Sequence, residues 1–88
     1  MTPATATLLT KEDCAYCDQA KQVLDRIAAD YPLAVQCLNL ESPQGEALAR
    51  RVGALFAPVV LIDDELFSCG RLSERRLRRH LDRALPAA

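Results

Sequence analysis

The chain has 88 residues, of which 50% are hydrophobic and 26% are charged, a balance typical of a folded domain rather than a disordered segment. No apolar run approaches the roughly 18 residues that a membrane helix requires, so we expect no association with a membrane. The formal net charge of −1 does not favour nucleic acid as a partner. We therefore predict a single domain over residues 1–88, with a core from about residue 5 to about residue 85.

The charges are divided unevenly along the chain. Residues 1–70 carry five Lys or Arg and ten Asp or Glu, whereas residues 71–88 carry six Arg and only two acidic residues, Glu74 and Asp82. The C-terminal segment is therefore basic on an otherwise acidic body. A solvated helix face, attraction of an acidic partner and nucleic-acid binding all remain open, although no aromatic residues are interleaved with the arginines.

The N-terminal residues contain neither a basic segment nor a long apolar run, so we expect no secretory signal and a cytoplasmic location. The chain has four cysteines, and their expected state depends on this compartment. In a reducing compartment, cysteines are more often free, catalytic or metal-binding than joined in a structural framework.

The first strand is predicted at residues 5–9, where β-branched and apolar residues precede a polar turn. Asp13 is expected to cap the helix that follows. The helix should end before Pro32, because proline disfavours a helical residue ahead of it. Spacing of three and four residues predicts one apolar stripe on this helix: Tyr16, Ala20, Val23, Leu24, Ile27 and Ala28.

A second strand is predicted at residues 33–40, followed by a short helix. Ser42 is suited to the cap of this helix and Pro43 to its first position. Gly53 is suited to its C-terminal end, because glycine readily adopts the left-handed conformation there. The apolar side of the helix is expected to comprise Leu48, Val52 and Leu55.

Residues 57–62 predict a third strand with its proline near the beginning, and residues 65–68 predict a fourth. Asp63 and Asp64 form the tight turn between them. A last helix begins after Ser73, with Leu72 and Leu77 placed to form a hydrophobic staple across the cap. Its buried face is expected to comprise Leu77, Leu81, Ala84 and Leu85. The predicted order is β-α-β-α-β-β-α.

Cys14-Ala15-Tyr16-Cys17 lies between the first strand and the first helix. Two thiols three positions apart at a helix start can exchange a disulfide with another molecule. We expect Cys14 to be the nucleophile and Cys17 the resolving thiol. The helix N-terminus and Lys11 would lower the pKa of Cys14, while the neighbouring acidic residues would raise it. A metal site and an inert pair of cysteines remain as alternatives.

The remaining cysteines and the single histidine do not complete a metal site. Cys37 and Cys69 are far apart in the sequence, and His80 belongs to the last helix. Cys37 is interpreted as a small core residue of the second strand. Cys69 is either an unreactive residue at a loop end or a third redox thiol, and His80 either packs or lies on the surface.

The chain resembles a glutaredoxin, or a glutaredoxin-like member of the thioredoxin superfamily. The matching features are Lys11, the Cys14-x-Tyr16-Cys17 motif, Ala57-Pro58-Val59 and Gly70. The resemblance implies an α/β fold of the thioredoxin-like, glutaredoxin type, with a four-stranded mixed sheet and helices on both faces. It also implies a thiol–disulfide oxidoreductase, a cis peptide bond before Pro58, and contacts from Tyr16 and the Ala57 backbone to a bound substrate.

In such a protein Cys14 and Cys17 are catalytic, and Lys11, Tyr16, Ala57, Pro58 and Gly70 line the site for substrate or glutathione. No bound organic cofactor is implied, because the electrons reside in the two sulfurs. The expected substrates are protein disulfides or glutathione-mixed disulfides. The protein is expected to be a monomer.

The chain departs from the family pattern at Ala15, at Phe56-Ala57 and at Cys69, where the family has proline, Thr-Val and the first of two glycines. Both glutathione and a thioredoxin reductase therefore stay open as electron donor. Two other classes of function also stay open: a non-catalytic module that binds a partner through Ala57-Pro58, and a metal carrier that uses Cys14 and Cys17.

Overall fold

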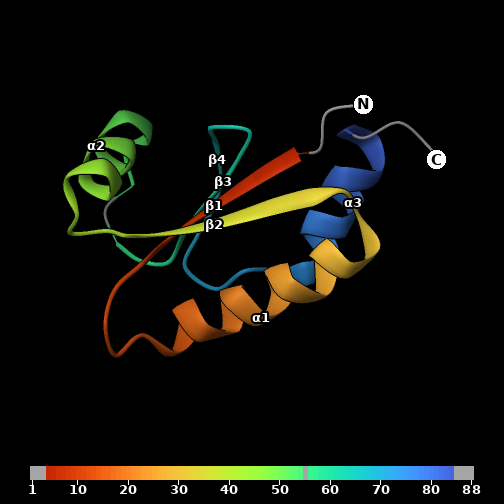
Figure 1. Ribbon diagram of the computed structural model, residues 1–88, viewed down its shortest axis with the longest axis horizontal. Helices are drawn as coiled ribbons and strands as arrows, with labels where there is room; N and C mark the ends of the chain where they lie inside the picture. Colours follow the sequence, from red (N-terminus) through yellow and green to blue (C-terminus); the bar gives the residue numbers. More distant parts are fainter. Residues whose placement is uncertain (1–3, 55, 85–88) are drawn as a thin grey trace.

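The computed structural model describes residues 4–54 and 56–84, and its element order is β-α-β-α-β-β-α, as predicted (Figure 1). The strands and helices are β1 (Ala4–Thr10), α1 (Ala15–Asp30), β2 (Leu33–Asn39), α2 (Pro43–Val52), β3 (Val59–Ile62), β4 (Glu65–Cys69) and α3 (Glu74–Ala84). Within these residues, no helix combines the length and apolar character needed to cross a bilayer.

The four strands form one mixed sheet in the spatial order β2-β1-β3-β4. β1 pairs with β2 in parallel and with β3 in antiparallel fashion, and β3 pairs with β4 in antiparallel fashion. Asp63 and Asp64 both have positive φ, 50° and 68°, in the tight turn between β3 and β4. This geometry suits the two central residues of a hairpin turn, where Asp is tolerated.

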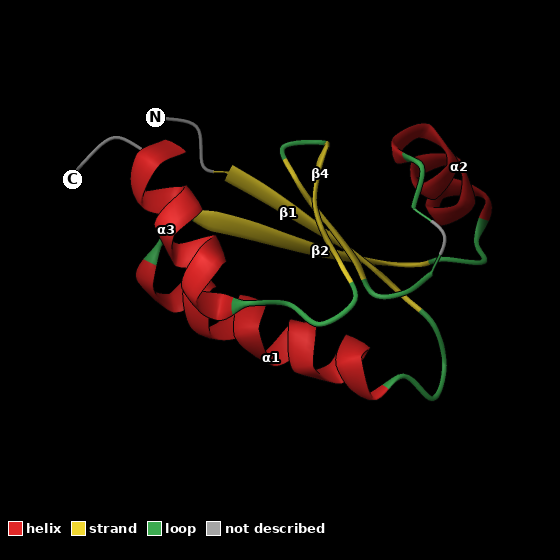
Figure 2. Cartoon of the chain, turned by 180° about the vertical axis from the view of Figure 1, so that it is seen from behind, coloured by secondary structure: helices red, strands yellow, loops and turns green. Residues whose placement is uncertain are grey.

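α1 and α3 lie side by side on one face of the sheet (Figure 2). The larger hydrophobic cluster lies between them and the sheet, because alternate residues of β1 point to this face. The hydroxyl of Ser73 caps α3 by accepting from the N–H of Arg76 at 3.2 Å, and the expected staple residues Leu72 and Leu77 are both buried. The cluster draws on β1, α1 and the α3 segment through Ala4, Ala6, Leu8, Val23, Leu24, Ile27, Leu72, Leu77 and Leu81.

α2 covers the opposite face of the sheet with a smaller cluster of four buried residues, Leu9, Ala49, Val59 and Leu61. Ser42 caps this helix and Pro43 occupies its first turn, as the sequence predicts. Gly53 ends it with φ of 75°, in the left-handed conformation. Helices therefore cover both faces of the sheet.

Several expectations about individual residues are wrong. Cys37 is exposed rather than in the core, because β2 is an edge strand. Ala84 is exposed at the end of α3. The second strand ends at Asn39, and the third begins only at Val59. The expected apolar residues Leu55 and Leu85 lie outside the described residues.

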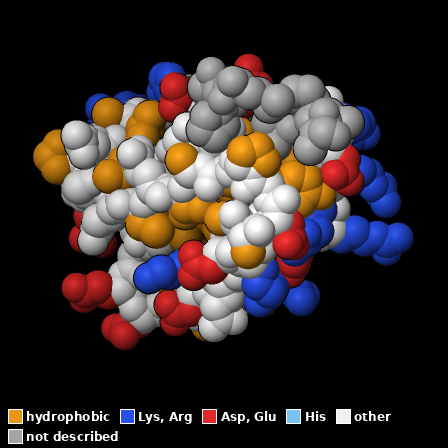
Figure 3. Space-filling view, turned by 45° about the vertical axis from the view of Figure 1, so that its right-hand side comes forward, with side chains coloured by type: hydrophobic (Ala, Val, Ile, Leu, Met, Phe, Trp, Pro, Cys, Tyr) orange, Lys and Arg blue, Asp and Glu red, His pale blue; other side chains and the backbone are white. Residues whose placement is uncertain are grey.

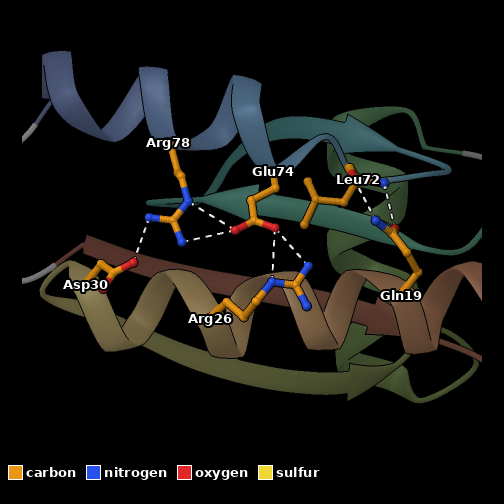
Figure 4. A network of polar contacts seen from close by, with 6 residues as sticks. All are labelled: Gln19, Arg26, Asp30, Leu72, Glu74 and Arg78. Carbon is orange, nitrogen blue, oxygen red and sulfur yellow. Dashed lines mark hydrogen bonds and ion pairs between the residues drawn. The ribbon is translucent and has the colours of Figure 1, made fainter.

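A network of charged side chains joins α1 to α3 (Figure 4). Glu74 accepts hydrogen bonds from Arg26 on α1 and from Arg78 one turn along α3. Arg78 also pairs with Asp30, the last residue of α1, at 2.8 Å. Both arginines hold the pKa of Glu74 below its ordinary value, with Arg26 as the larger cause. The network therefore fixes how α3 is placed along α1.

Candidate active site

Cys14 and Cys17 lie at the start of α1, and their sulfurs are joined in a disulfide. Their Cα atoms are 5.2 Å apart. Cys17 is only 4% exposed, whereas Cys14 is half-buried at the helix boundary. Cys14 is therefore the more accessible cysteine, which is the arrangement required when one sulfur is attacked from outside and the other lies behind it.

Cys14, rather than Asp13, caps α1, so the expected cap is wrong. The backbone N–H of Cys17 donates to Sγ of Cys14 at 3.2 Å. Asp13 instead occupies the preceding turn with φ of 55°, a conformation that Asp tolerates better than most residues. A backbone N–H directed at a sulfur favours the thiolate once the disulfide is opened, because it bonds the charged form.

Lys11 lies three residues before Cys14, Tyr16 lies between the two cysteines, and both side chains are exposed. Tyr16 is 57% exposed, so the prediction that it belongs to the apolar stripe of α1 is wrong. Cys17 takes that place instead, in one buried stripe with Ala20, Val23, Leu24 and Ile27. Tyr16 is therefore directed towards solvent beside the two cysteines.

The peptide bond between Ala57 and Pro58 is cis, as the resemblance implies, and Pro58 is buried. The carbonyl of Pro58 accepts from the N–H of Gly70 at 2.8 Å, which joins the start of β3 to the end of β4. Gly70 has φ of 92°, a backbone conformation that suits glycine. Within residues 4–54 and 56–84, the backbone of Ala57 makes no hydrogen bond to another backbone group.

Phe56 and Cys69 adjoin the cis-proline. Phe56 is 58% exposed, and its carbonyl accepts from the thiol of Cys69 at 3.2 Å. Cys69 is the last residue of β4, opposite Val59, rather than part of a loop. Phe56 is therefore an exposed aromatic side chain directly before Ala57-Pro58, at one of the positions where the chain departs from the family pattern.

The expected site residues lie in two groups, and hydrogen bonds between Gln19 and Leu72 connect the segments that carry them. Lys11, Tyr16 and the cysteines lie around the start of α1, and Ala57, Pro58 and Gly70 lie where β3 begins and β4 ends. Gln19, two residues after Cys17, donates to the carbonyl of Leu72 at 2.9 Å and accepts from its N–H at 3.1 Å. These bonds hold the segment after Gly70 against α1.

No set of three or more His, Cys, Asp or Glu side chains is gathered for a metal ion within the described parts of the chain. Cys37 and Cys69 are both free and exposed. His80 packs its ring against Phe67, with the ring centroids 5.3 Å apart. Among the described residues, Cys14 and Cys17 are therefore the only two cysteines close enough to form a disulfide with each other.

A four-stranded mixed sheet with helices on both faces, a C-x-x-C disulfide at the start of the first helix and a cis-proline at the start of β3 define a protein of the thioredoxin superfamily. A sequence profile for the glutaredoxin-like domain (DUF836) matches residues 5–82. The chain therefore belongs to this glutaredoxin-like family. No curated protein sequence matches the chain.

Solved structures agree on the fold. The chain is similar to a point-mutant thioredoxin from Halobacterium salinarum, with a TM-score of 0.77 at 18% sequence identity, over 99% of this chain and 79% of that chain. It is also similar to an uncharacterized thioredoxin-like protein from Clostridium perfringens, with a TM-score of 0.74 at 18% identity, over 93% and 71% of the two chains. At this level of identity, the likeness establishes the thioredoxin-like fold.

Proposed function

We propose that this protein is a thiol–disulfide oxidoreductase that reduces protein disulfides or glutathione-mixed disulfides through Cys14 and Cys17. One observation carries the proposal: the two sulfurs form a disulfide at a helix start, with Cys14 accessible and Cys17 buried behind it. A disulfide with this unequal access can open and close in two steps, because only one sulfur meets the substrate.

The reaction begins from the reduced pair. The Cys14 thiolate attacks one sulfur of the substrate disulfide and forms a mixed disulfide, and the other substrate sulfur leaves and takes up a proton. The Cys17 thiolate then attacks Sγ of Cys14 and releases the second substrate thiol, which also takes up a proton. The substrate has gained two electrons and two protons, and the Cys14–Cys17 disulfide seen in the structure is the oxidised product.

Residues around the disulfide are assigned supporting roles in this proposal. Lys11 supplies a positive charge ahead of the helix, which favours the Cys14 thiolate. Tyr16 covers a bound substrate, and the backbone of Ala57 beside Pro58, which has no backbone partner among the described residues, bonds an extended chain. Gly70 keeps the end of β4 close to Pro58. Two molecules of glutathione, or one turnover of a thioredoxin reductase, restore the dithiol.

Cysteine variants test this proposal. A disulfide peptide is supplied with NADPH and either glutathione plus glutathione reductase or thioredoxin reductase, and NADPH consumption is followed. We expect Cys14→Ser to reduce turnover to background with both donors. Cys17→Ser should instead accumulate a mixed disulfide with the peptide, seen by mass spectrometry, because its resolving thiol is missing. The donor that supports wild-type turnover identifies the reductant.

Cys37→Ser is the matched control, because Cys37 is a free, exposed cysteine on the edge strand β2. It should keep wild-type turnover. Retention of turnover by Cys14→Ser would refute the catalytic role and leave a partner-binding module. If the wild-type protein shows no turnover with either donor and retains one Cu(I) or Zn(II) per chain through dialysis, the metal carrier would be favoured instead.

A further inference from the structure

A cavity of about 480 Å³ lies between α1 and the start of α3. Its walls carry three arginines, Arg26, Arg71 and Arg75, and two neutral polar side chains, Gln19 and Ser73. We call it the arginine cavity. Neither active-site cysteine lines it. Three guanidinium groups around one hollow make it a candidate binding site for an anionic group.

The charge of this cavity is not balanced by the protein itself. Glu74 also lines it, but its carboxylate already accepts from Arg26 and from Arg78. Arg71 and Arg75 pair with no acidic side chain within residues 4–54 and 56–84. The cavity therefore presents two uncompensated positive charges.

The basic surface continues along α3. Arg76, Arg79 and Arg83 also lack an ion pair among the residues that the structure describes, whereas Arg78 is engaged in the network with α1. Figure 3 shows several basic side chains on the right-hand side of the molecule, with a few acidic side chains among them and others at the lower left. Because residues 1–70 have more acidic than basic side chains, this gathering is a local feature.

The walls of the cavity are held in place before any ligand binds. Both polar atoms of the Gln19 amide are bonded to the backbone of Leu72, which fixes the segment that carries Arg71 and Ser73 (Figure 4). Arg26 is held by two hydrogen bonds to one oxygen of Glu74. A preformed site binds more tightly than a mobile one, because fewer groups lose freedom on binding.

The cavity is close to the disulfide along α1. Gln19 follows Cys17 by two residues and Arg26 follows it by nine, so the cavity spans about 3 to 14 Å beyond Cys17 along the helix axis. An extended chain advances about 3.3 Å per residue. If an extended substrate follows α1, a side chain roughly two to four residues from its reacting cysteine therefore lies as far from Cys17 as the cavity does.

We propose that the arginine cavity and the unpaired arginines of α3 bind an acidic segment of the protein whose disulfide is exchanged with Cys14. A carboxylate of this segment enters the cavity between Arg71 and Arg75, and the next residues follow α3. This inference rests on the proposed function. It favours a polypeptide over nucleic acid, because the chain has a net charge of −1 and no aromatic residue stands among these arginines for base stacking.

Two synthetic substrates test the proposal. Both are peptides with the same internal disulfide, but one carries a short run of Glu two residues after its second cysteine and the other carries Gln there. We expect kcat/KM for the Glu peptide to exceed that for the Gln peptide by about tenfold at low salt. The ratio should approach one at about 1 M salt, where charges are screened beyond roughly 3 Å.

The double variant Arg71→Gln/Arg75→Gln should lower this ratio to about two or less. Arg71→Lys/Arg75→Lys retains both positive charges and should keep most of the preference, because the attraction depends mainly on charge. Arg50→Gln/Arg51→Gln removes the same charge from α2, on the opposite face of the sheet, and should leave the ratio unchanged. An equal fall in both Gln variants would overturn the proposal, because general attraction would then explain the preference.

A binding measurement separates this inference from the proposed function. The Cys14→Ser/Cys17→Ser variant, which cannot exchange disulfides, is titrated with each peptide by calorimetry. Tighter binding of the Glu peptide supports the acidic docking site even if neither peptide is ever reduced. Equal binding of the two peptides, or displacement of the Glu peptide by a lower concentration of a single-stranded oligonucleotide, would overturn it.

Discussion

The two helices α3 and α2 are attached to opposite faces of the same sheet by different means. α3 inserts large side chains, Leu77 and Leu81, into the main cluster and is tied to α1 by charged side chains. α2 fully buries only the small residues Gly45 and Ala49, and its larger apolar residues Leu48 and Val52 are half-buried against the cluster. A Cβ atom built on Gly45 would lie 2.0 Å from the carbonyl oxygen of Asn39, so at this point the backbones are in close contact.

A larger side chain therefore stabilises the packing of α3, whereas at the closest contact of α2 a larger side chain destabilises it. On the α3 face, removing atoms leaves a cavity and lowers the free energy of unfolding. On the α2 face, adding a single carbon is the damaging change, because the neighbour is backbone that cannot rotate away. Three substitutions test the comparison.

Leu77→Ala should have the largest effect. Leu77 is fully buried in the cluster beneath α3, so we expect the free energy of unfolding to fall by about 3 kcal/mol. Urea denaturation followed by circular dichroism measures the change. Leu66→Ala is the control, because Leu66 is 45% exposed on β4 and its truncation should cost less than about 1 kcal/mol. Equal losses would mean that α3 is not held by its buried side chains.

Gly45→Ala should follow, with a loss of about 2 kcal/mol caused by overpacking against Asn39. Helix propensity alone predicts the opposite sign, since Ala is favoured over Gly inside a helix by roughly 0.5–1 kcal/mol. Gly53→Ala is the matched control: it has open space around its Cβ position but φ of 75°, so we expect a loss of about 1 kcal/mol. A stabilised Gly45→Ala protein would contradict the close backbone contact.

Glu74→Gln should have the smallest effect at neutral pH and a characteristic dependence on acid. The folded-state pKa of Glu74 lies below its ordinary value of 4.5, through Arg26 first and Arg78 second. Its ion pairs therefore add stability above that value, and the contribution is lost as the pH falls through 4.5 towards the folded-state pKa. The difference in melting temperature between wild type and Glu74→Gln should shrink over this range. A difference that does not change between neutral and acidic pH would show that the carboxylate charge is unimportant.

Local patterns predicted most of the fold. The order of seven elements, the caps at Ser42 and Ser73, and the left-handed end of α2 at Gly53 follow from short-range rules of spacing and backbone conformation. The predictions for Cys37 and Tyr16 failed for a shared reason. Both residues sit in apolar surroundings along the chain, but an edge strand and a helix end leave them exposed.

The candidate site was predictable only in part. Cys14 and Cys17 are visible as a motif, and their proximity follows because three positions of helix bring them within one turn. The contact between Pro58 and Gly70 was not derivable from spacing, because it depends on how β3 and β4 pair. The arginine cavity was likewise hidden, since Arg26 and Arg75 are brought together only when α1 and α3 pack.

The helices and strands, their order and the cysteine pair could be read from local sequence, because each depends on residues only a few positions apart. The exposure of individual side chains, the pairing of the arginines and the close approach of α2 to the sheet became visible only in the folded chain. Caps, turns and the C-x-x-C spacing act within one or two helical turns. Burial and charge pairing depend instead on residues that are distant in sequence and adjacent in space, such as Arg26 and Glu74.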